Sequence, residues 1–158
     1  MLPMRAYAVV FFVLMSVVTP IYAADITGTP RIIDGDTIEV AGQRIRLHGI
    51  DSPERRQRCT RRDGTSYHCG EAATEALQTL IGSQMVRCEG TKTDRYDRLI
   101  ATCFTGGINI NAEMVLQGWA LAYRRYSKDY VSAVREAQKA KRGMWAGGFE
   151  QPWVWRWK

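Results

Sequence analysis

The chain of 158 residues is long enough for one ordinary domain, and its 46% hydrophobic and 24% charged residues are typical of a globular protein. Lysine and arginine number 22 and aspartate and glutamate 16, which gives a net charge of +6. This balance excludes an acidic-surface protein and favours polyanionic partners, such as nucleic acid, acidic polysaccharide or an anionic membrane surface.

The N-terminal segment has the layout of a secretory signal peptide. A positive charge precedes an apolar stretch at residues 6–18, and the small residues Ala23 and Ala24 suit a cleavage site. The apolar stretch is shorter than the ~20 residues of a membrane-spanning helix, which disfavours an uncleaved anchor. We therefore expect a signal peptide at residues 1–24, a single domain at 25–158, and an exported protein that is periplasmic or secreted.

Short strands dominate the start of the expected domain. The β-like segments are residues 32–33, 37–40 and 43–48. In the last of these segments Ile45 and Leu47 share one face and Arg46 lies on the other. We therefore expect the Arg46 side chain to point away from the hydrophobic core.

Three helices are predicted by apolar residues at helical spacing. The first ends at Gly82, the second begins after an Asn111 cap and the third after a Ser127 cap. A strand hairpin over about 84–105 and a short strand at 108–110 separate the first helix from the second. The pattern predicts an α+β domain with five strands and three helices and no internal linker.

Four cysteines in an exported protein indicate two disulfides. Pairing Cys88 with Cys103 centres the predicted hairpin on the turn at 93–98, which leaves Cys59 and Cys69 to close a second loop. A zinc site is the competing interpretation, although no CxxC spacing is present. Its candidate ligands would be Cys59, Cys69, His48 and His68.

Three short polar segments carry the candidate chemistry. Residues 34–37 read Asp-Gly-Asp-Thr, residues 46–54 read Arg-Leu-His-Gly-Ile-Asp-Ser-Pro-Glu, and residues 94–98 read Asp-Arg-Tyr-Asp-Arg. Each segment alone is typical of a solvated turn. Together they supply oxygen ligands for a divalent cation, a further carboxylate for water and two arginines, which are the parts that a phosphodiester hydrolase needs.

These segments, with the run Asn-x-x-Met-Val-x-x-Gly-x-Ala at 111–120, resemble the staphylococcal nuclease, or thermonuclease, family. The resemblance covers about residues 28–146. It implies an OB-fold barrel of five strands with three helices, and a Ca²⁺-dependent nuclease that hydrolyses DNA, RNA or both. We expect nucleic acid as the partner and a monomer as the working form.

The resemblance also implies how a calcium ion would be held. Asp36 and Asp51 match the family's calcium-binding aspartates, and the backbone carbonyl of Ser52 matches a third ligand. Asp34 would lie just behind these ligands. A set made only of oxygen atoms suits Ca²⁺ better than a soft metal.

The remaining roles concern catalysis and substrate. Glu54 matches the glutamate that orients or deprotonates the attacking water, and Arg46 and Arg98 match the arginines that bind the scissile phosphate. The other residues expected to contact substrate are Arg95, Tyr96, Tyr123 and Tyr126, of which one of the last two would stack on a base.

The sequence departs from the family in three places. Asp97 stands where members commonly have glycine, so it must tolerate a positive φ, and its carboxylate would be able to draw Arg98 away from a phosphate. The Cys59–Cys69 insertion, with the arginines at 55–62, has no counterpart in the staphylococcal protein. It would be either a phosphate-contacting rim of the site or a solvated surface loop. The aromatic tail at 153–158 is expected to pack on the domain rather than to contact bases.

Two other functions remain open at this point. One is a non-catalytic OB-fold protein that binds single-stranded nucleic acid through its basic surface and tyrosines. The other is an exported accessory protein that binds acidic polysaccharide of the envelope. Cleavage of nucleic acid would separate an enzyme from both.

Overall fold

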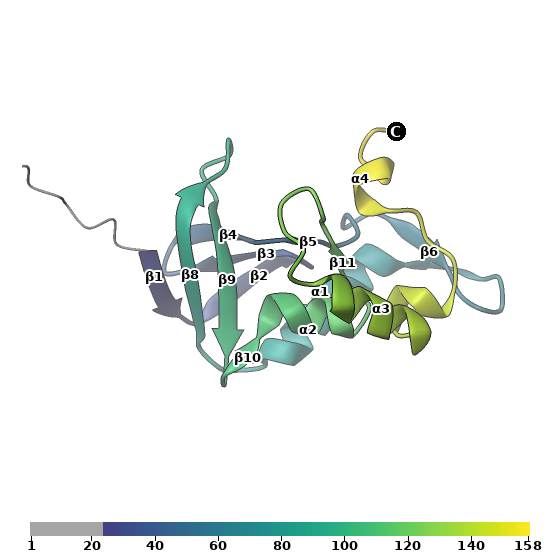
Figure 1. Cartoon of the computed structure of the whole chain (residues 1–158), viewed down its shortest axis with the longest axis horizontal. Coiled ribbons are helices and arrows are strands. Elements are labelled where there is room, and N and C mark those ends of the chain that lie inside the picture. Colours follow the sequence, from purple (N-terminus) through teal and green to yellow (C-terminus); the bar gives the residue numbers. More distant parts are fainter. Residues whose placement is uncertain (1–23) are drawn as a thin grey trace, which may run out of the picture.

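The computed structural model describes residues 24–158, so the expected signal peptide falls outside the described residues except for Ala24. A strongly curled mixed sheet forms half of a barrel, and helices pack along its sides (Figure 1). This arrangement confirms the predicted α+β fold of the OB type. None of the helices within 24–158 has the length and apolar character that a membrane crossing requires.

The main sheet has the strand order β1-β8-β9-β4-β3-β2, with β10 added beside β9. Neighbours are antiparallel except for the parallel pair β4 and β9. The strands are β1 (Ala24–Gly28), β2 (Pro30–Asp34), β3 (Thr37–Val40), β4 (Gln43–Leu47), β8 (Val86–Thr93), β9 (Leu99–Thr105) and β10 (Ile108–Asn109). The sheet has seven strands rather than five because β1 pairs with β8 and β10 with β9.

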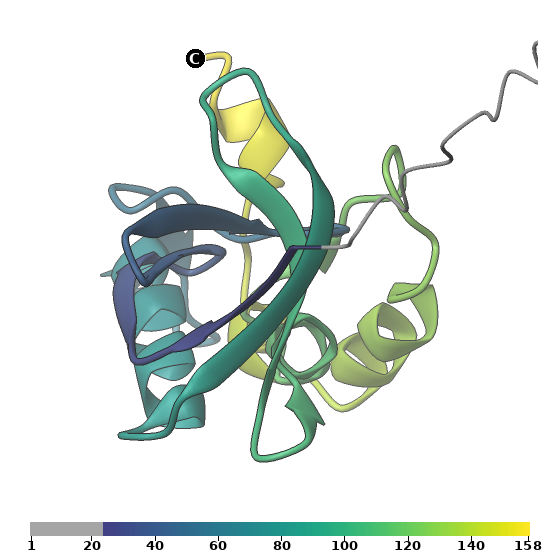
Figure 2. The ribbon, with the colours of Figure 1, turned by 90° about the vertical axis from the view of Figure 1, so that its left-hand side faces the viewer.

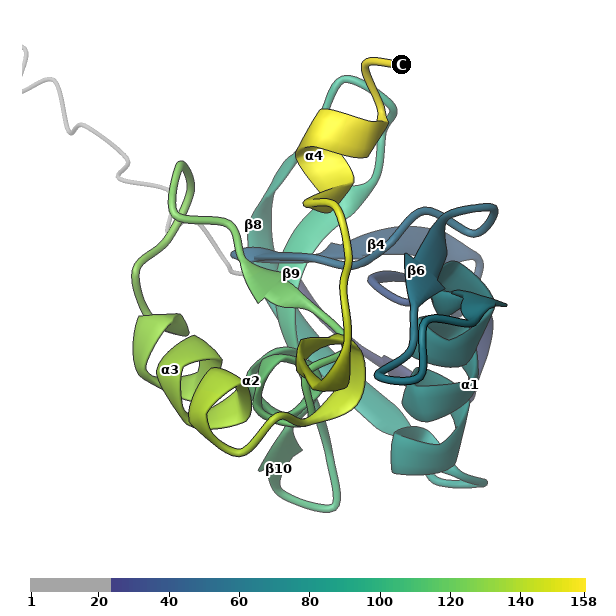
Figure 3. The same ribbon diagram turned by 90° about the vertical axis from the view of Figure 1, so that its right-hand side faces the viewer.

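Two small sheets and the helices complete the domain. The small sheets are β5 (Ile50–Asp51) with β11 (Leu121–Ala122), and β6 (Arg58–Thr60) with β7 (Ser66–His68). The helices are α1 (Cys69–Ile81), α2 (Ile110–Leu116), α3 (Val131–Lys139), α4 (Pro152–Trp155) and the 3₁₀ turn η1 (Gly143–Ala146). Figures 2 and 3 show α1 on one side of the curled sheet and α3 on the other.

Alternation along the strands builds the core. Alternate residues of β9 are buried, from Leu99 to Thr105, and β4 buries Ile45 and Leu47 while Arg46 stays partly exposed. Helix α1 adds Leu77, which is fully buried against these strands. Each such aliphatic side chain contributes about 1.5–3 kcal/mol when it leaves water. The expected orientation of Arg46 is confirmed.

Two of the predicted helix starts are wrong. Helix α2 is capped by Asn109, whose side chain accepts from the Ala112 N–H, and Ile110 opens the helix instead of ending a strand. Asn111 is fully buried and bridges other elements: it accepts from the Cys103 N–H and donates to two backbone carbonyls. A buried amide is stable only with such partners, so long-range bonding outcompetes capping here.

The third helix begins later than expected. Ser127 accepts the N–H of Asp129 in a turn, and α3 starts only at Val131, after Tyr130. The Ser127 hydroxyl therefore stabilises the turn that precedes the helix, which is the local competition that serine side chains commonly provide.

Both predicted disulfides are present. Cys88 and Cys103 face each other directly in the β8–β9 register, and Cys59–Cys69 joins β6 to the start of α1. Among the described residues no cysteine is left free, so the alternative zinc site lacks its thiolates. Closing a loop of 15 residues restricts the unfolded chain and contributes about 3 kcal/mol.

Candidate active site

The close approach of two bends brings the predicted site together. A Cβ at Gly35 would lie 2.5 Å from the Ser52 hydroxyl oxygen and 2.9 Å from the Ala73 Cβ, so only glycine lets the bend after β2 lie against Ser52. The Ser52 N–H then donates to Asp36 Oδ2 at 2.8 Å. The first and second polar segments, 34–37 and 46–54, therefore form one site.

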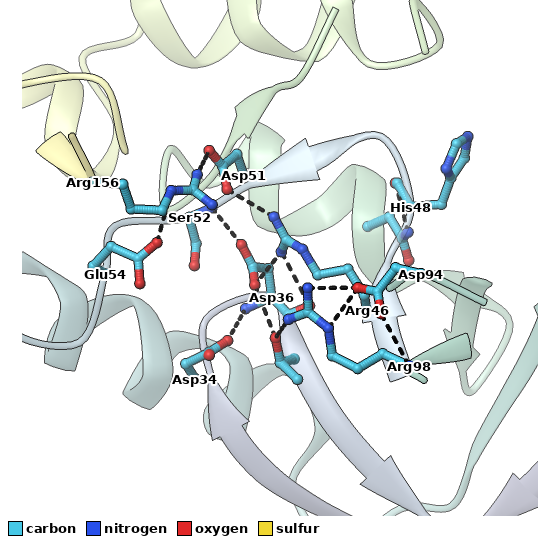
Figure 4. A network of polar contacts seen from close by, with 12 residues as sticks. Asp34, Asp36, Arg46, His48, Asp51, Ser52, Glu54, Asp94, Arg98 and Arg156 are labelled. Atoms are coloured by element: carbon cyan, nitrogen blue, oxygen red, sulfur yellow. Dashed lines mark hydrogen bonds and ion pairs between the residues drawn. The ribbon is translucent and has the colours of Figure 1, made fainter. Parts of the chain in front are cut away.

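Asp36, Arg46 and Asp51 form the centre of a buried ion-pair network (Figure 4). Arg46 Nη1 pairs with Asp36 Oδ1, and Arg46 Nη2 donates to Asp51 Oδ1 at 2.7 Å. Behind them, the Asp36 N–H donates to Asp34 Oδ1 at 3.0 Å. Arg46 is placed for these contacts because β4 pairs it directly with Thr37 of β3.

Arg98 reaches the same network from the β8–β9 turn. Its Nη1 donates to the Thr37 hydroxyl oxygen at 3.5 Å, and that hydroxyl donates to Asp36 Oδ1 at 3.1 Å. Its Nε and Nη2 pair with Asp94 Oδ2 at 2.8 and 2.7 Å. Asp97 has the expected positive φ of 59°, but Asp94 rather than Asp97 holds the Arg98 guanidinium.

Arg156 is a site residue that the sequence analysis missed. It follows α4, lies 105 residues beyond Asp51 in the chain, and pairs through Nη2 with Asp51 Oδ2. Its Nε lies 3.0 Å from Glu54 Oε1, so one guanidinium bridges the predicted metal ligand and the predicted water-activating carboxylate. Figure 4 shows Arg156 and Glu54 at one end of the network and Arg98 with Asp94 at the other.

The charges in this network perturb its carboxylates. Burial, followed by the charge of Asp36, raises the pKa of Asp34 to about 6. The same two causes raise the pKa of Asp51 to about 6, although Arg46 and Arg156 act in the opposite direction. Burial also opposes ionisation of Asp36, but Arg46 and the Ser52 N–H outweigh it and hold the pKa of Asp36 below its ordinary value.

The pKa values of Arg46 and Asp94 are shifted in the directions that their charged partners favour. Burial alone would lower the pKa of Arg46, but the charges of Asp36 and Asp51 raise it above its ordinary value. Burial would raise the pKa of Asp94, and the hydrogen bonds from Arg98 hold it lower. Arg46 therefore stays a cation, and Asp36 and Asp94 stay ionised, at neutral pH.

The donor set fits a divalent cation. Asp36, Asp51 and Glu54 pair with two arginines, Arg46 and Arg156, and Asp34 accepts the Asp36 N–H behind them, so four carboxylates face two guanidinium groups, an excess of two negative charges. Within residues 24–158 no three His, Cys, Asp or Glu side chains form a metal cage by themselves. A cation here would take two carboxylates, a backbone carbonyl and water, which is oxygen coordination of the kind that hard cations accept.

A groove of about 1340 Å³ runs beside the network. Arg46 and Arg98 line it together with the predicted substrate-contacting residues Arg95, Tyr96, Tyr123 and Tyr126. Its other charged lining residues are Lys92, Arg125, Arg156, Glu89 and Asp94. Arg46, Arg98 and Arg156 are paired with carboxylates, whereas Lys92, Arg95 and Arg125 take part in none of the ion pairs within residues 24–158 and give the groove a positive charge that suits a phosphate backbone.

The arginine-rich segment does not reach this groove. Arg58 donates to the Ser66 hydroxyl oxygen at 2.9 Å, and Arg61 lies over the Tyr67 ring at 4.6 Å. Arg61 and Arg62 instead line a separate, mostly apolar cavity of about 770 Å³ beside Trp119. The β6–β7 hairpin thus directs these arginines away from the predicted site.

The domain has a curled OB-type sheet, and its basic groove borders carboxylates and two arginines that can each donate paired hydrogen bonds to a phosphate. These features define a phosphodiester-hydrolysing nuclease. The comparisons with known proteins agree. The model of the family described as "Staphylococcal nuclease homologue" matches residues 44–147. The chain belongs to this family, whose nucleases are generally metal-dependent.

Three curated relatives illustrate the family. "Uncharacterized endonuclease" of Escherichia coli O157:H7 is 36% identical over 146 residues, 87% of this chain and 89% of that protein. "Micrococcal nuclease" of Shigella flexneri is 33% identical over 171 residues, 97% and 91% of the two chains. "Succinoglycan biosynthesis protein ExoI" of Rhizobium meliloti (strain 1021) is 37% identical over 126 residues, 78% of this chain and 66% of that protein.

Proposed function

We propose that the protein is an exported, Ca²⁺-dependent nuclease that cleaves phosphodiester bonds of DNA, RNA or both. The observation that supports this most directly is the single network that joins Asp36, Asp51 and Glu54 to Arg46, at the edge of a basic groove. Endonuclease and nuclease names among the relatives support the same reaction class.

The cation would be held by Asp36, Asp51 and the Ser52 carbonyl. When bound, Ca²⁺ supplies positive charge next to the scissile phosphate and binds water. Calcium is favoured over softer metals because the candidate ligands are all oxygen atoms. The excess of two negative charges in the network gives the same preference for a divalent ion.

Arg46 and Arg98 would hold the scissile phosphate. Each guanidinium presents paired N–H donors to phosphate oxygens, where negative charge accumulates in the transition state. In the structure these donors are occupied by Asp36, Asp51 and Asp94. A phosphate would therefore replace these carboxylates as the partner of the two guanidinium groups.

Glu54 would orient the attacking water and accept its proton. Its carboxylate is only about one-third exposed and is fixed by the Arg156 Nε, so it has a defined position beside Asp51. The attack forms a new P–O bond to the water oxygen while the bond to the leaving oxygen of the sugar breaks. General-base assistance of this kind contributes roughly 10²–10⁴-fold to rate.

A digestion assay tests the proposal. Purified protein is incubated with single- and double-stranded DNA and RNA, first with Ca²⁺ and then with excess chelator, and products are followed on denaturing gels. We expect cleavage with Ca²⁺ and none with chelator. Equal cleavage in chelator would contradict the cation, and binding without any cleavage would contradict the enzyme and favour the OB-fold binder.

Acidic polysaccharide is the second candidate ligand, because one relative is named a succinoglycan biosynthesis protein and the groove is basic. The digestion assay therefore includes binding to an acidic polysaccharide as a separate arm. Tight binding of the polysaccharide, together with no cleavage of any nucleic acid, would favour the envelope-accessory function. Export itself is tested by N-terminal sequencing of the mature protein, which should begin near Ala23 or Ala24.

A further inference from the structure

Exposed aromatic side chains gather in one place. Among residues 24–158 the strongly exposed large hydrophobic side chains are three aromatics, Tyr96, Tyr126 and Trp157, and three others, Met85, Ile108 and Val154. All three aromatics line the basic groove, and none of the three others does. The exposed aromatic side chains are therefore concentrated in the groove rather than scattered over the surface.

Trp157 is the most exposed of them, at 90%, and lines the groove together with Tyr96 of the β8–β9 turn. Figure 1 shows that turn and α4 rising from the same side of the molecule, and Figure 3 shows the segment between β11 and α3 to one side of both. Three separate segments, the β8–β9 turn, the segment between β11 and α3 and the C-terminal segment, thus each contribute one exposed aromatic residue to the groove.

The segment around Trp157 is anchored although Trp157 itself is free of packing. Trp153 stacks on Tyr123 with ring centroids 5.3 Å apart, and Arg156 pairs with Asp51 and Glu54. Lys158 pairs with Glu150 at 2.8 Å on the other side of Trp157. An indole that is held at both neighbouring residues and still points into solvent is positioned for a ligand.

The chemistry of the groove identifies that ligand. Lys92, Arg95 and Arg125 add positive charge along the groove, which suits a chain of phosphates, and exposed aromatic rings suit the flat faces of bases. In the interior of a duplex both faces of a base are covered by its neighbours in the stack, so away from the duplex ends only an unpaired base offers a face to Trp157. A volume of about 1340 Å³ also exceeds that of a typical small-molecule pocket, ~300–1000 Å³, which favours an oligomeric ligand.

We propose that the C-terminal segment Trp153–Lys158 forms a nucleotide subsite in which Trp157 stacks on an unpaired base of the bound strand. The proposal deepens the proposed nuclease function and rests on it. Trp157 lines the same groove as Arg46 and Arg98, so this nucleotide would lie along the same strand as the phosphate that would be cleaved. This corrects the expectation that the aromatic tail only packs: Trp153 packs, whereas Trp157 is presented in the groove.

Binding of fluorescently labelled oligonucleotides tests the subsite. The full chain carrying Glu54→Gln, which prevents turnover, is compared with the same chain carrying Trp157→Ala as well, by fluorescence anisotropy with Ca²⁺ present. Loss of one stacked base should weaken binding of a short single-stranded oligothymidylate by at least about fivefold. Trp157→Phe should recover part of that loss, and a blunt duplex should bind equally well to both proteins.

Val154→Ala is the matched control, because Val154 is 43% exposed on α4, three residues before Trp157, but lies outside the groove. It should bind oligothymidylate like its parent. The proposal is overturned if Trp157→Ala binds single strands unchanged, if Val154→Ala loses as much affinity, or if duplex binding falls in parallel. If the wild-type chain cleaves no nucleic acid but its affinity for single strands still depends on Trp157, the subsite is supported and the nuclease function is overturned. Failure of the subsite and failure of the nuclease function are therefore distinguishable.

Discussion

A bound divalent cation should largely remove the pH dependence of stability that the site carboxylates impose. The pKa values of Asp34 and Asp51 are raised to about 6 in the folded protein, against an ordinary value of 3.8. The folded state therefore binds more protons than the unfolded state between these values. Without a cation, the free energy of unfolding should fall as pH rises from about 4 to about 7.

The size of this effect follows from the shifts. Each carboxyl is displaced by about 2 pKa units, and one unit corresponds to 1.36 kcal/mol, so each contributes a loss of about 3 kcal/mol once it is ionised. The low pKa of Asp36 acts in the opposite direction but below about pH 4, outside this window. A cation bound to Asp36 and Asp51 offsets the repulsion, and the loss should largely disappear.

Urea unfolding followed by tryptophan fluorescence measures this, at several pH values between about 4 and 7, with chelator and with saturating Ca²⁺. Asp51→Asn removes one of the two titrating groups and should flatten the chelator curve by about half. The reasoning is refuted if stability in chelator does not fall with pH, or if Ca²⁺ leaves that fall unchanged.

Three further outcomes are expected. Glu54→Gln should keep fold and Ca²⁺ affinity but lower kcat by roughly 10²–10⁴-fold, because shape is kept and the proton acceptor is lost; wild-type turnover would show that Glu54 has another role. Arg156→Gln should tighten Ca²⁺ binding in calorimetry, since a guanidinium that competes for Asp51 is removed; weaker binding would contradict that competition. Asn111→Ala removes the amide from the Cys103 N–H and the His48 carbonyl, whereas the Ala101 carbonyl keeps the His48 N–H at 2.8 Å, and should lower the free energy of unfolding by about 3 kcal/mol; a loss below about 1 kcal/mol would mean that water replaces the amide.

Local patterns predicted the parts of the fold that local physics determines. Alternation placed Ile45 and Leu47 inside and Arg46 outside, and hairpin symmetry paired Cys88 with Cys103. The Asn111 cap was wrong because the deciding contacts of that side chain are long-range, with His48, Ala101 and Cys103. No sequence pattern marks which backbone groups a buried amide will meet.

The same distinction holds for the site. The polar segments at 34–37, 46–54 and 94–98 were recognised as motifs, and the structure joins them in one network. Arg156 has no motif around it, and its contact with Asp51 spans 105 residues. The one available signal was the aromatic tail that precedes it, because Pro152 at the helix start and Trp153 on Tyr123 fix where α4 ends.

The kinetic comparison of Arg46→Lys and Arg98→Lys with wild type tests the central claim most directly. Lysine keeps the charge but cannot present paired donors to a phosphate. At saturating Ca²⁺ each variant should bind oligonucleotide within a few-fold of wild type while losing at least about 10²-fold in kcat. If both variants hydrolyse DNA at the wild-type rate, the network of carboxylates and arginines described here does not carry out the cleavage.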